Sequence, residues 1–164
     1  MRTIEGTQRG AGMRFALVVS RYNDFVTDKL QAGALAALTA AGVAPDAITV
    51  VRVPGAFEIP TAAHAAARSG QFDAIVCLGC VIRGETPHFE YIASAVAHGL
   101  VAGSRETGVP MTFGVLTTNS VEEALERAAE GPANKGSEAA RAAVEMAAVV
   151  GQLGARTWAE PRRT

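Results

Sequence analysis

An apolar run near the middle of the chain, residues 74–82, restricts the possible folds more than any other stretch. It contains Ala, Ile, Val, Cys, Leu and one Gly, with no polar residue at alternate positions. A strand with one face in water shows such alternation, whereas a strand buried on both faces does not. The run therefore predicts a central strand of a parallel sheet.

The pattern of an apolar strand followed by a helix occurs four times. The strands are predicted at residues 13–20, 47–53, 74–82 and 109–117, and the helices at 27–42, 59–68, 88–106, 120–130 and 137–154. Thr27 and Thr86 are the expected N-caps of the first and third helices, with Pro87 at the next position. With right-handed crossovers, this alternation predicts an α/β, flavodoxin-like three-layer sandwich with a four-stranded parallel sheet.

A chain of 164 residues and 16.9 kDa has room for one domain of this kind. We expect an N-terminal arm at residues 1–12, a single domain at 13–154 and a flexible C-terminal tail at 155–164. The arm carries Ile4 among mostly polar residues and cannot bury that side chain alone. Residues 4–6 are therefore expected to add as an edge strand to the sheet of a neighbouring subunit.

Charge and hydropathy exclude several partners. The net charge is −1 and the pI about 6.3, which favours small-molecule substrates over nucleic acid. The first residues lack an apolar signal segment, and no apolar run is long enough to span a membrane, so a cytoplasmic protein is expected. The hydrophobic fraction of 49% contains few aromatics, which predicts burial against other copies of the chain.

Cys77 and Cys80 have the spacing of a redox or zinc motif, but both lie in the predicted central strand. Residues three apart in a strand point to opposite faces, and the chain has no second cysteine pair. We therefore expect no metal site and no redox role, with Cys77 as a small buried side chain.

Chemically useful side chains follow the strands, at the edge of the sheet where ligands bind in folds of this type. Gly84 permits a tight turn, and the backbone NH groups of residues 84–86 form an expected anion nest one turn before His88. No nucleotide-binding glycine motif occurs, so no nucleotide cofactor is expected. The turns after the four strands should converge on this edge. In order, they contain Tyr22-Asn23; Ala56-Phe57-Glu58; Gly84-Glu85-Thr86-Pro87-His88; and Thr117-Thr118-Asn119, with Phe113 inside the fourth strand.

Each candidate also has a purely structural interpretation. His88 fits a surface histidine in a strand-to-helix turn, and the aromatic rings of Tyr22 and Phe57 fit fillers at the edge of the core. Glu58 fits a first-turn carboxylate that favours the helix dipole. Arg127 and Lys135 fit solvated surface charges.

Four motifs in order give the chain a resemblance to the 6,7-dimethyl-8-ribityllumazine synthase family of riboflavin biosynthesis. They are Ser20-Arg21-Tyr22-Asn23-Asp24-Phe25; Val53-Pro54-Gly55-Ala56-Phe57-Glu58-Ile59-Pro60; Gly79-Cys80-Val81-Ile82-Arg83-Gly84-Glu85-Thr86-Pro87-His88-Phe89-Glu90-Tyr91; and Glu126-Arg127-Ala128 followed by Asn134-Lys135-Gly136. The resemblance extends over nearly the whole chain.

The resemblance implies condensation of 5-amino-6-(D-ribitylamino)uracil with 3,4-dihydroxy-2-butanone 4-phosphate, giving the lumazine, phosphate and water without metal or cofactor. It implies His88 as the acid/base and Tyr22 as the residue that stacks on the pyrimidine. Its further assignments are Ala56, Phe57 and Glu58 on the ribityl chain; Cys80, Val81 and Ile82 on the pyrimidine edge; Glu85, Thr86 and Arg127 on the phosphate; and Lys135 near the ligands. Phe113 and Arg127 are expected from the adjacent subunit.

The resemblance also implies a homopentamer, and the short link at residues 128–135 favours an icosahedral shell of pentamers. Riboflavin synthase is a further partner that the resemblance implies. Pro132 fixes the backbone in that link and removes an NH group. It either stiffens the bend through which pentamers meet or directs the link away from the neighbouring pentamer. Two departures from the family pattern are Tyr22, where phenylalanine or tryptophan is usual, and the acidic Glu85 at the phosphate nest.

Two other classes of function fit the same fold. One is a flavin-binding flavodoxin-like module without catalysis, and the other is a shell-forming structural protein. The combination of Glu58, His88, Arg127 and Lys135 favours the enzyme, because neither binding nor scaffolding requires that set.

Overall fold

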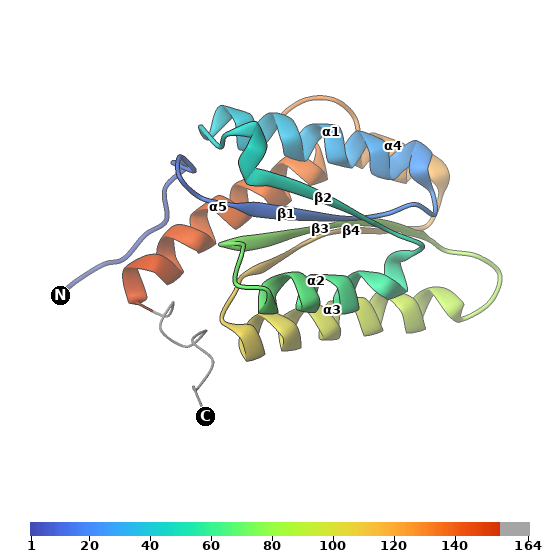
Figure 1. The fold of residues 1–164 in the computed structure, drawn as a ribbon. Coiled ribbons are helices and arrows are strands. Elements are labelled where there is room, and N and C mark those ends of the chain that lie inside the picture. Colours follow the sequence, from blue (N-terminus) through green and yellow to red (C-terminus); the bar gives the residue numbers. More distant parts are fainter. Residues whose placement is uncertain (155–164) are drawn as a thin grey trace.

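The structure is a computed structural model that describes residues 1–154, and its strands and helices alternate along the chain (Figure 1). The elements are β1 (Phe15–Ser20), α1 (Asp24–Ala40), η1 (Pro45–Ala47), β2 (Ile48–Val53), η2 (Ala56–Glu58), α2 (Ile59–Arg68), β3 (Ala74–Ile82), α3 (His88–Thr107), β4 (Met111–Thr118), α4 (Val121–Arg127) and α5 (Lys135–Leu153).

The four strands form one parallel sheet in the order β2-β1-β3-β4, which confirms the predicted flavodoxin-like arrangement. β1 and β3 pair from Phe15 and Ala74 to Val19 and Leu78, whereas β3 stays paired with β4 as far as Ile82. The last residues of β3 therefore extend past the end of β1. This overhang lies at the carboxyl edge, where ligands bind in open α/β sheets.

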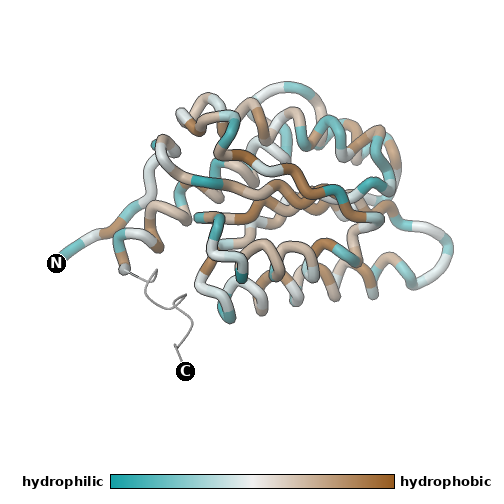
Figure 2. The backbone as a smooth tube through the Cα atoms, in the orientation of Figure 1, coloured by the Kyte–Doolittle hydropathy of each residue, from teal (hydrophilic) through white to brown (hydrophobic). Residues whose placement is uncertain are grey.

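Two apolar layers cover the sheet, and the hydropathy colouring in Figure 2 is most apolar along the central strands. Helices α1, α4 and α5 pack on one face, and α2 and α3 on the other (Figure 1). Successive residues of β3 alternate between these layers, since Val76 and Leu78 join the first and Ile75 the second. The prediction of a strand buried on both faces is confirmed.

The two cysteines lie in different layers, Cys80 with α1 and α5 and Cys77 with α2 and α3. Burial raises the pKa of Cys80 to about 11 and that of Cys77 further, so both thiols stay protonated at neutral pH. Cys77 is fully buried, as expected for a small apolar side chain.

Helix α1 begins earlier than its predicted cap. Its N-cap is Asn23, and Thr27 lies inside the helix, where its Oγ1 donates to the Ser20 carbonyl at 2.7 Å. The prediction that Thr27 caps this helix was wrong, because its hydroxyl ties the helix to the end of β1 instead. Similarly, the cap position of α3 is Pro87 rather than Thr86, so the helix starts with His88 itself.

Helix α4 ends at Arg127, ahead of the expected Gly131-Pro132, and α5 starts at Lys135 rather than Ser137. Asn134 explains the earlier start of α5. Its Oδ1 accepts hydrogen bonds from the NH groups of Gly136 and Ser137, while its Nδ2 donates to the carbonyls of Ala128 at 2.8 Å and Lys29 at 3.2 Å. The side chain is 2% exposed, so one buried amide joins the α4–α5 link to α1.

The N-terminal arm lies along α5 of its own chain. Gln8 Nε2 donates to the Arg141 carbonyl at 3.1 Å and to Glu145 Oε1 at 2.8 Å, and Gln152 Nε2 donates to the Glu5 carbonyl. Residues 1–12 form no strand in the single chain, so strand addition to a neighbour stays a prediction. The predicted tail at 155–164 lies outside the described residues. No helix within residues 1–154 combines the length and apolar character needed to cross a membrane.

Candidate functional site

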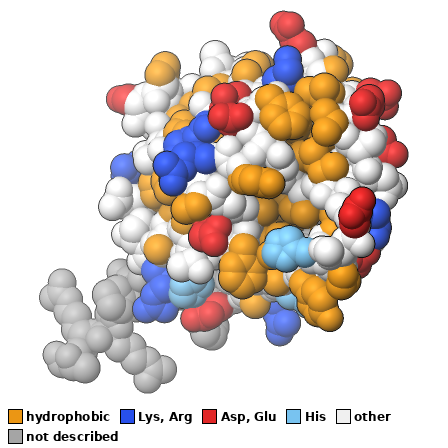
Figure 3. Space-filling model, turned by 90° about the vertical axis from the view of Figure 1, so that its right-hand side faces the viewer, with side chains coloured by type: hydrophobic (Ala, Val, Ile, Leu, Met, Phe, Trp, Pro, Cys, Tyr) orange, Lys and Arg blue, Asp and Glu red, His pale blue; other side chains and the backbone are white. Residues whose placement is uncertain are grey.

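A cavity of about 510 Å³, the main hollow, opens where β1, β2 and β3 end. Figure 3 looks onto this edge of the molecule, and apolar side chains gather across the middle of the view with charged groups scattered around them. The hollow is lined by Tyr22, Asn23, Pro54, Gly55, Ala56, Phe57, Glu58, Cys80, Val81, Ile82, Gly84, Thr86, His88, Phe89 and Ile92.

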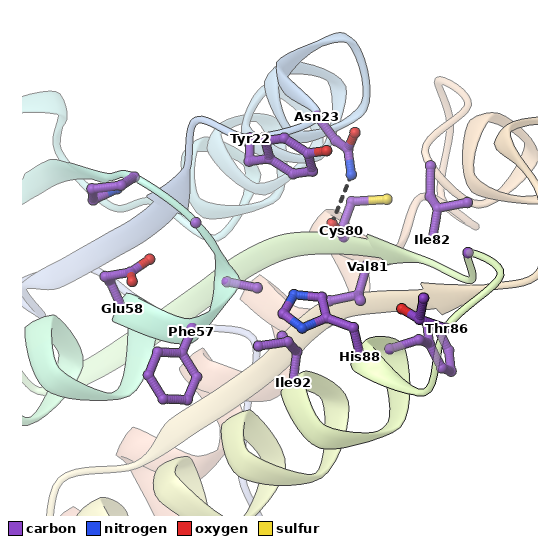
Figure 4. A pocket seen from close by; sticks show the side chains of 15 residues that line it. Tyr22, Asn23, Phe57, Glu58, Cys80, Val81, Ile82, Thr86, His88 and Ile92 are labelled. Atoms are coloured by element: carbon purple, nitrogen blue, oxygen red, sulfur yellow. Dashed lines mark hydrogen bonds between the residues drawn. The ribbon is translucent and has the colours of Figure 1, made fainter.

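The aromatic rings at the rim are displayed rather than buried. Tyr22 is 73% exposed and Phe57 59%, and Figure 4 places them on opposite sides of the hollow. A ring that filled the edge of the core would be covered, so the core-filling interpretation of both residues does not hold. Their faces are available to stack on a planar ligand.

The β2–α2 turn brings a carboxylate to the same rim. Gly55 matters here because a Cβ at this position would lie 3.1 Å from Glu58 Oε2. A glycine thus leaves room for the Glu58 carboxylate beside the turn, while Ala56 is buried beneath it. The turn presents backbone groups and one negative charge to the cavity.

The floor of the hollow is the overhang of β3, formed by Cys80, Val81 and Ile82. Because β1 has already ended, the backbone of these residues has no strand partner on that side. The Asn23 Nδ2 donates to the Cys80 carbonyl at 3.0 Å in place of a strand (Figure 4). The remaining backbone groups of the overhang suit the donor and acceptor pattern of a heterocycle edge.

The loop between β3 and α3 has the free backbone NH groups expected of an anion nest. In the described part of the chain, the backbone NH groups of Gly84, Glu85 and Thr86 donate to no protein group. Thr86 lines the hollow, whereas Glu85 is exposed and outside the lining, so its carboxylate does not fill the cavity. Free NH groups next to a helix start favour a bound anion.

His88 is the first residue of α3 and lies in the hollow among Val81, Thr86 and Ile92 (Figure 4). Its side chain is exposed, and no group within residues 1–154 forms a hydrogen bond with the imidazole. The ring is therefore free to exchange a proton with a ligand held between the nest and the floor.

Arg83, which the sequence analysis left without a role, fastens this loop. Its NH donates to the Thr118 carbonyl at 2.8 Å, and its guanidinium donates to Asn119 Oδ1 at 2.9 Å and pairs with Glu90. The guanidinium also lies 4.5 Å from the centre of the Phe89 ring. A hydrogen bond from its own backbone NH, and then Arg83, lower the pKa of the Glu90 carboxyl.

The other predicted residues do not reach the main hollow of their own chain. A second hollow of about 380 Å³ lies along β4, lined by Thr112, Phe113, Gly114, Val115, Leu116, Thr117, Arg127, Lys135, Glu138, Ala139 and Ala142. There Arg127 donates to the Glu123 carbonyl at 3.1 Å and Lys135 pairs with Glu138 at 2.8 Å. Phe113 is 48% exposed.

The main hollow also contains side chains that had been given no role in the predicted site: Asn23, Pro54, Phe89 and Ile92. Phe89 and Ile92 could have been predicted, because they lie one residue and one turn after His88 on α3. The position of Asn23 in the turn after the first strand placed it at this edge, but an asparagine before a helix is expected to cap it, so its bond to β3 was missed. Within residues 1–154, no cluster of His, Cys, Asp or Glu is suited to hold a metal ion.

The family model described as 6,7-dimethyl-8-ribityllumazine synthase matches residues 12–150. This match covers all four strands of the sheet, the lining of the main hollow and the lining of the second hollow. The chain belongs to the 6,7-dimethyl-8-ribityllumazine synthase family, whose enzymes serve riboflavin biosynthesis.

Proposed function

We propose that the protein condenses 5-amino-6-(D-ribitylamino)uracil with 3,4-dihydroxy-2-butanone 4-phosphate, and releases 6,7-dimethyl-8-ribityllumazine, phosphate and water. The observation that carries the proposal is the main hollow, which joins exposed aromatic rings, a carboxylate, free backbone NH groups and an imidazole in one cavity. Family membership adds the reaction class.

The pyrimidine substrate takes the inner part of the hollow in this proposal. Tyr22 stacks on its ring, and the backbone of Cys80, Val81 and Ile82 pairs with its edge. The ribityl chain runs toward η2, where backbone groups of Ala56 and Phe57 and the Glu58 carboxylate accept or donate hydrogen bonds. Such a planar and polyhydroxylated ligand matches a site with a ring on one side and polar groups on the other.

The butanone phosphate takes the end of the hollow near the β3–α3 loop. Its phosphate binds the NH groups of Glu85 and Thr86, which sets the ketone between the pyrimidine amine and His88. Formation of the carbon–nitrogen bond and departure of phosphate both need proton transfers, which His88 supplies. Holding the two substrates side by side provides much of the acceleration.

The lining of the main hollow contains no lysine or arginine. A phosphate dianion bound only to backbone NH groups would lack a counter-charge, and the second hollow holds Arg127 and Lys135. We infer that the second hollow of one subunit closes the main hollow of the next. Arg127 then clamps the phosphate, Phe113 covers the pyrimidine and Lys135 lies close to both substrates, within a homopentamer.

The decisive assay mixes the purified protein with both substrates and follows the fluorescence of the lumazine. The expected result is a rate well above the slow reaction without protein, with His98→Ala as a control that alters an exposed histidine farther along α3. A rate equal to that background would overturn the proposal. A protein that retains a coloured flavin and makes no lumazine would favour the binding module, and an inactive shell would favour the structural protein.

Light scattering tests the assembly. A pentamer is expected, and a hollow particle of pentamers is the larger form favoured by the short α4–α5 link. A monomer or dimer with full activity would contradict the shared site. A lone active pentamer would contradict only the shell.

A further inference from the structure

Asn23 has an unusual backbone for its position. With φ 62° and ψ 43°, it is the sole non-glycine residue with positive φ among residues 1–154. The left-handed region disfavours side chains with a Cβ, although asparagine tolerates it better than most. Non-glycine residues in this region tend to occur at functional sites, where the surrounding structure holds them in place.

The side chain of Asn23 is also used in an unusual way. It is the N-cap of α1, yet its amide makes no capping hydrogen bond, and only its backbone carbonyl accepts from the NH groups of Val26 and Thr27. The amide turns toward the hollow instead and donates to the Cys80 carbonyl at 3.0 Å (Figure 4). The left-handed backbone thus directs the amide away from its own helix and onto β3.

This amide replaces a missing strand. β1 pairs with β3 up to Leu78, and the Cys80 carbonyl lies just past that point. Beyond Cys80, residues 81 and 82 line the hollow with no support from β1. Asn23 therefore marks the place where hydrogen bonding within the sheet stops and hydrogen bonding to a ligand begins.

The same turn is fastened to the third side of the hollow. The NH of Arg21 donates to the Val53 carbonyl at 2.8 Å, and the NH of Tyr22 donates to the Pro54 carbonyl at 3.0 Å. Residues 21–23 therefore connect the ends of β1, β2 and β3. A shift of the turn would move the stacking ring of Tyr22 and the floor of the hollow relative to each other.

We propose that Asn23 is a positioning residue that sets the register of the β3 overhang against a bound heterocycle. It acts through the Cys80 carbonyl, and its effect is specific to the ligand that pairs with residues 80–82. The identity of this ligand as the pyrimidine substrate rests on the proposed function. Loss of the amide should weaken pyrimidine binding and leave the phosphate end of the site intact.

Two substitutions distinguish the contribution of the Asn23 amide from that of the left-handed backbone conformation. Asn23→Gly keeps access to positive φ and removes the amide. Asn23→Asp keeps a residue that tolerates this conformation and replaces the donor with an oxygen that faces the Cys80 carbonyl. If Asn23 matters only for the turn conformation, Asn23→Gly should bind the pyrimidine as tightly as wild type does. If its amide positions β3, both variants should bind the pyrimidine more weakly.

In the lumazine assay, we expect the KM for the pyrimidine to rise about tenfold in Asn23→Gly and further in Asn23→Asp, the scale of one lost hydrogen bond. The KM for the butanone phosphate should stay within about twofold of wild type because the nest is untouched. Wild-type KM values in Asn23→Gly, or an equal rise in both KM values, would overturn the proposal.

Hydrogen exchange without substrate gives a readout independent of activity. Both variants should exchange several-fold faster than wild type at residues 79–82, with unchanged exchange at residues 15–19 and at the nest. Faster exchange in Asn23→Gly alone would reflect glycine flexibility and overturn the proposal, as would unchanged exchange in both. If the wild type makes no lumazine, the proposed function fails, and this exchange result still decides the role of Asn23.

Discussion

The main hollow and the second hollow of one chain hold different halves of what a phosphorylated substrate needs. The main hollow has free NH groups and an imidazole but no cationic side chain in its lining, whereas the second has Arg127 and Lys135. In the isolated chain Arg127 donates to the backbone carbonyl of Glu123, and Lys135 pairs with the Glu138 carboxylate. In the assembly proposed above, a single chain would contribute to two sites, each completed by a different neighbour.

Removal of the imidazole is the largest expected loss on the main-hollow side. His88→Ala should reduce turnover by about 10- to 1,000-fold, in the range for losing general acid/base help, while both substrates still bind. Steady-state rates and substrate binding, measured beside the His98→Ala control, check this prediction. Wild-type turnover in His88→Ala would refute the assignment, but a small residual rate would not, since the condensation proceeds slowly without enzyme.

Removal of the guanidinium tests the second hollow. Arg127→Ala should raise the KM for the butanone phosphate about tenfold or more, because charge-assisted hydrogen bonds to phosphate are lost. The KM for the pyrimidine should change little. Arg105→Ala, at an exposed position in the last turn of α3, is the matched control. A selective rise in the pyrimidine KM would show that the role of Arg127 is misassigned.

Mixed assemblies test whether the two hollows meet. Co-expression of His88→Ala and Arg127→Ala subunits with different tags should give hetero-oligomers in which some sites combine an intact His88 with an intact Arg127. In a ring of equal parts, about a quarter of the sites should be intact. At butanone phosphate concentrations well below the wild-type KM, activity of the purified mixture should approach that fraction of wild type. Activity no higher than that of the single variants would place both residues in the same chain's site.

The smallest expected effect concerns the loop that carries the nest. The pKa of Glu90 is lowered in the fold, so its contribution to stability is present above the unfolded value near 4.5 and is lost as pH falls through the folded value. Exchange at residues 83–90 should therefore increase below about pH 4.5 in the wild type. Glu90→Gln should show a flatter pH response, and identical profiles for both proteins would exclude the Arg83 pair as a support of the loop.

The sequence predicted the layers well because burial patterns and turn residues are local signals. The unbroken apolar run of β3 identified a strand covered on both faces, and the spacing of Cys77 and Cys80 placed their thiols in different layers. The helix N-caps were harder to predict. Thr27 and Asn23 are both plausible caps by type, but neither side chain caps the helix. The Thr27 hydroxyl donates to the Ser20 carbonyl, and the Asn23 amide donates to the distant Cys80 carbonyl, which no local pattern contains.

The candidate site could also be predicted only where local sequence signals determine it. The turns after β1, β2 and β3 meet at one cavity, where Tyr22, Glu58, Thr86 and His88 lie, whereas Phe113 and Thr117 of β4 line the second hollow. Arg83 was missed because its value lies in contacts with Asn119 and Glu90, on other elements. The positions of Phe113 and Arg127 away from that cavity were expected only through resemblance, which assigned Lys135 to no particular subunit, since composition and spacing say nothing about a neighbouring subunit.

Asn134 has a consequence for the outer shape of any assembly. Its amide fixes both ends of the α4–α5 link against α1, and the link carries Gly131 and Pro132 on the exterior. If neighbouring subunits meet at this link, the angle between α4 and α5 sets the curvature of the surface that they form together. Asn134 helps to hold that angle, together with the packing of α5 against α1, so a substitution at this buried residue is expected to alter the radius of the proposed closed particle.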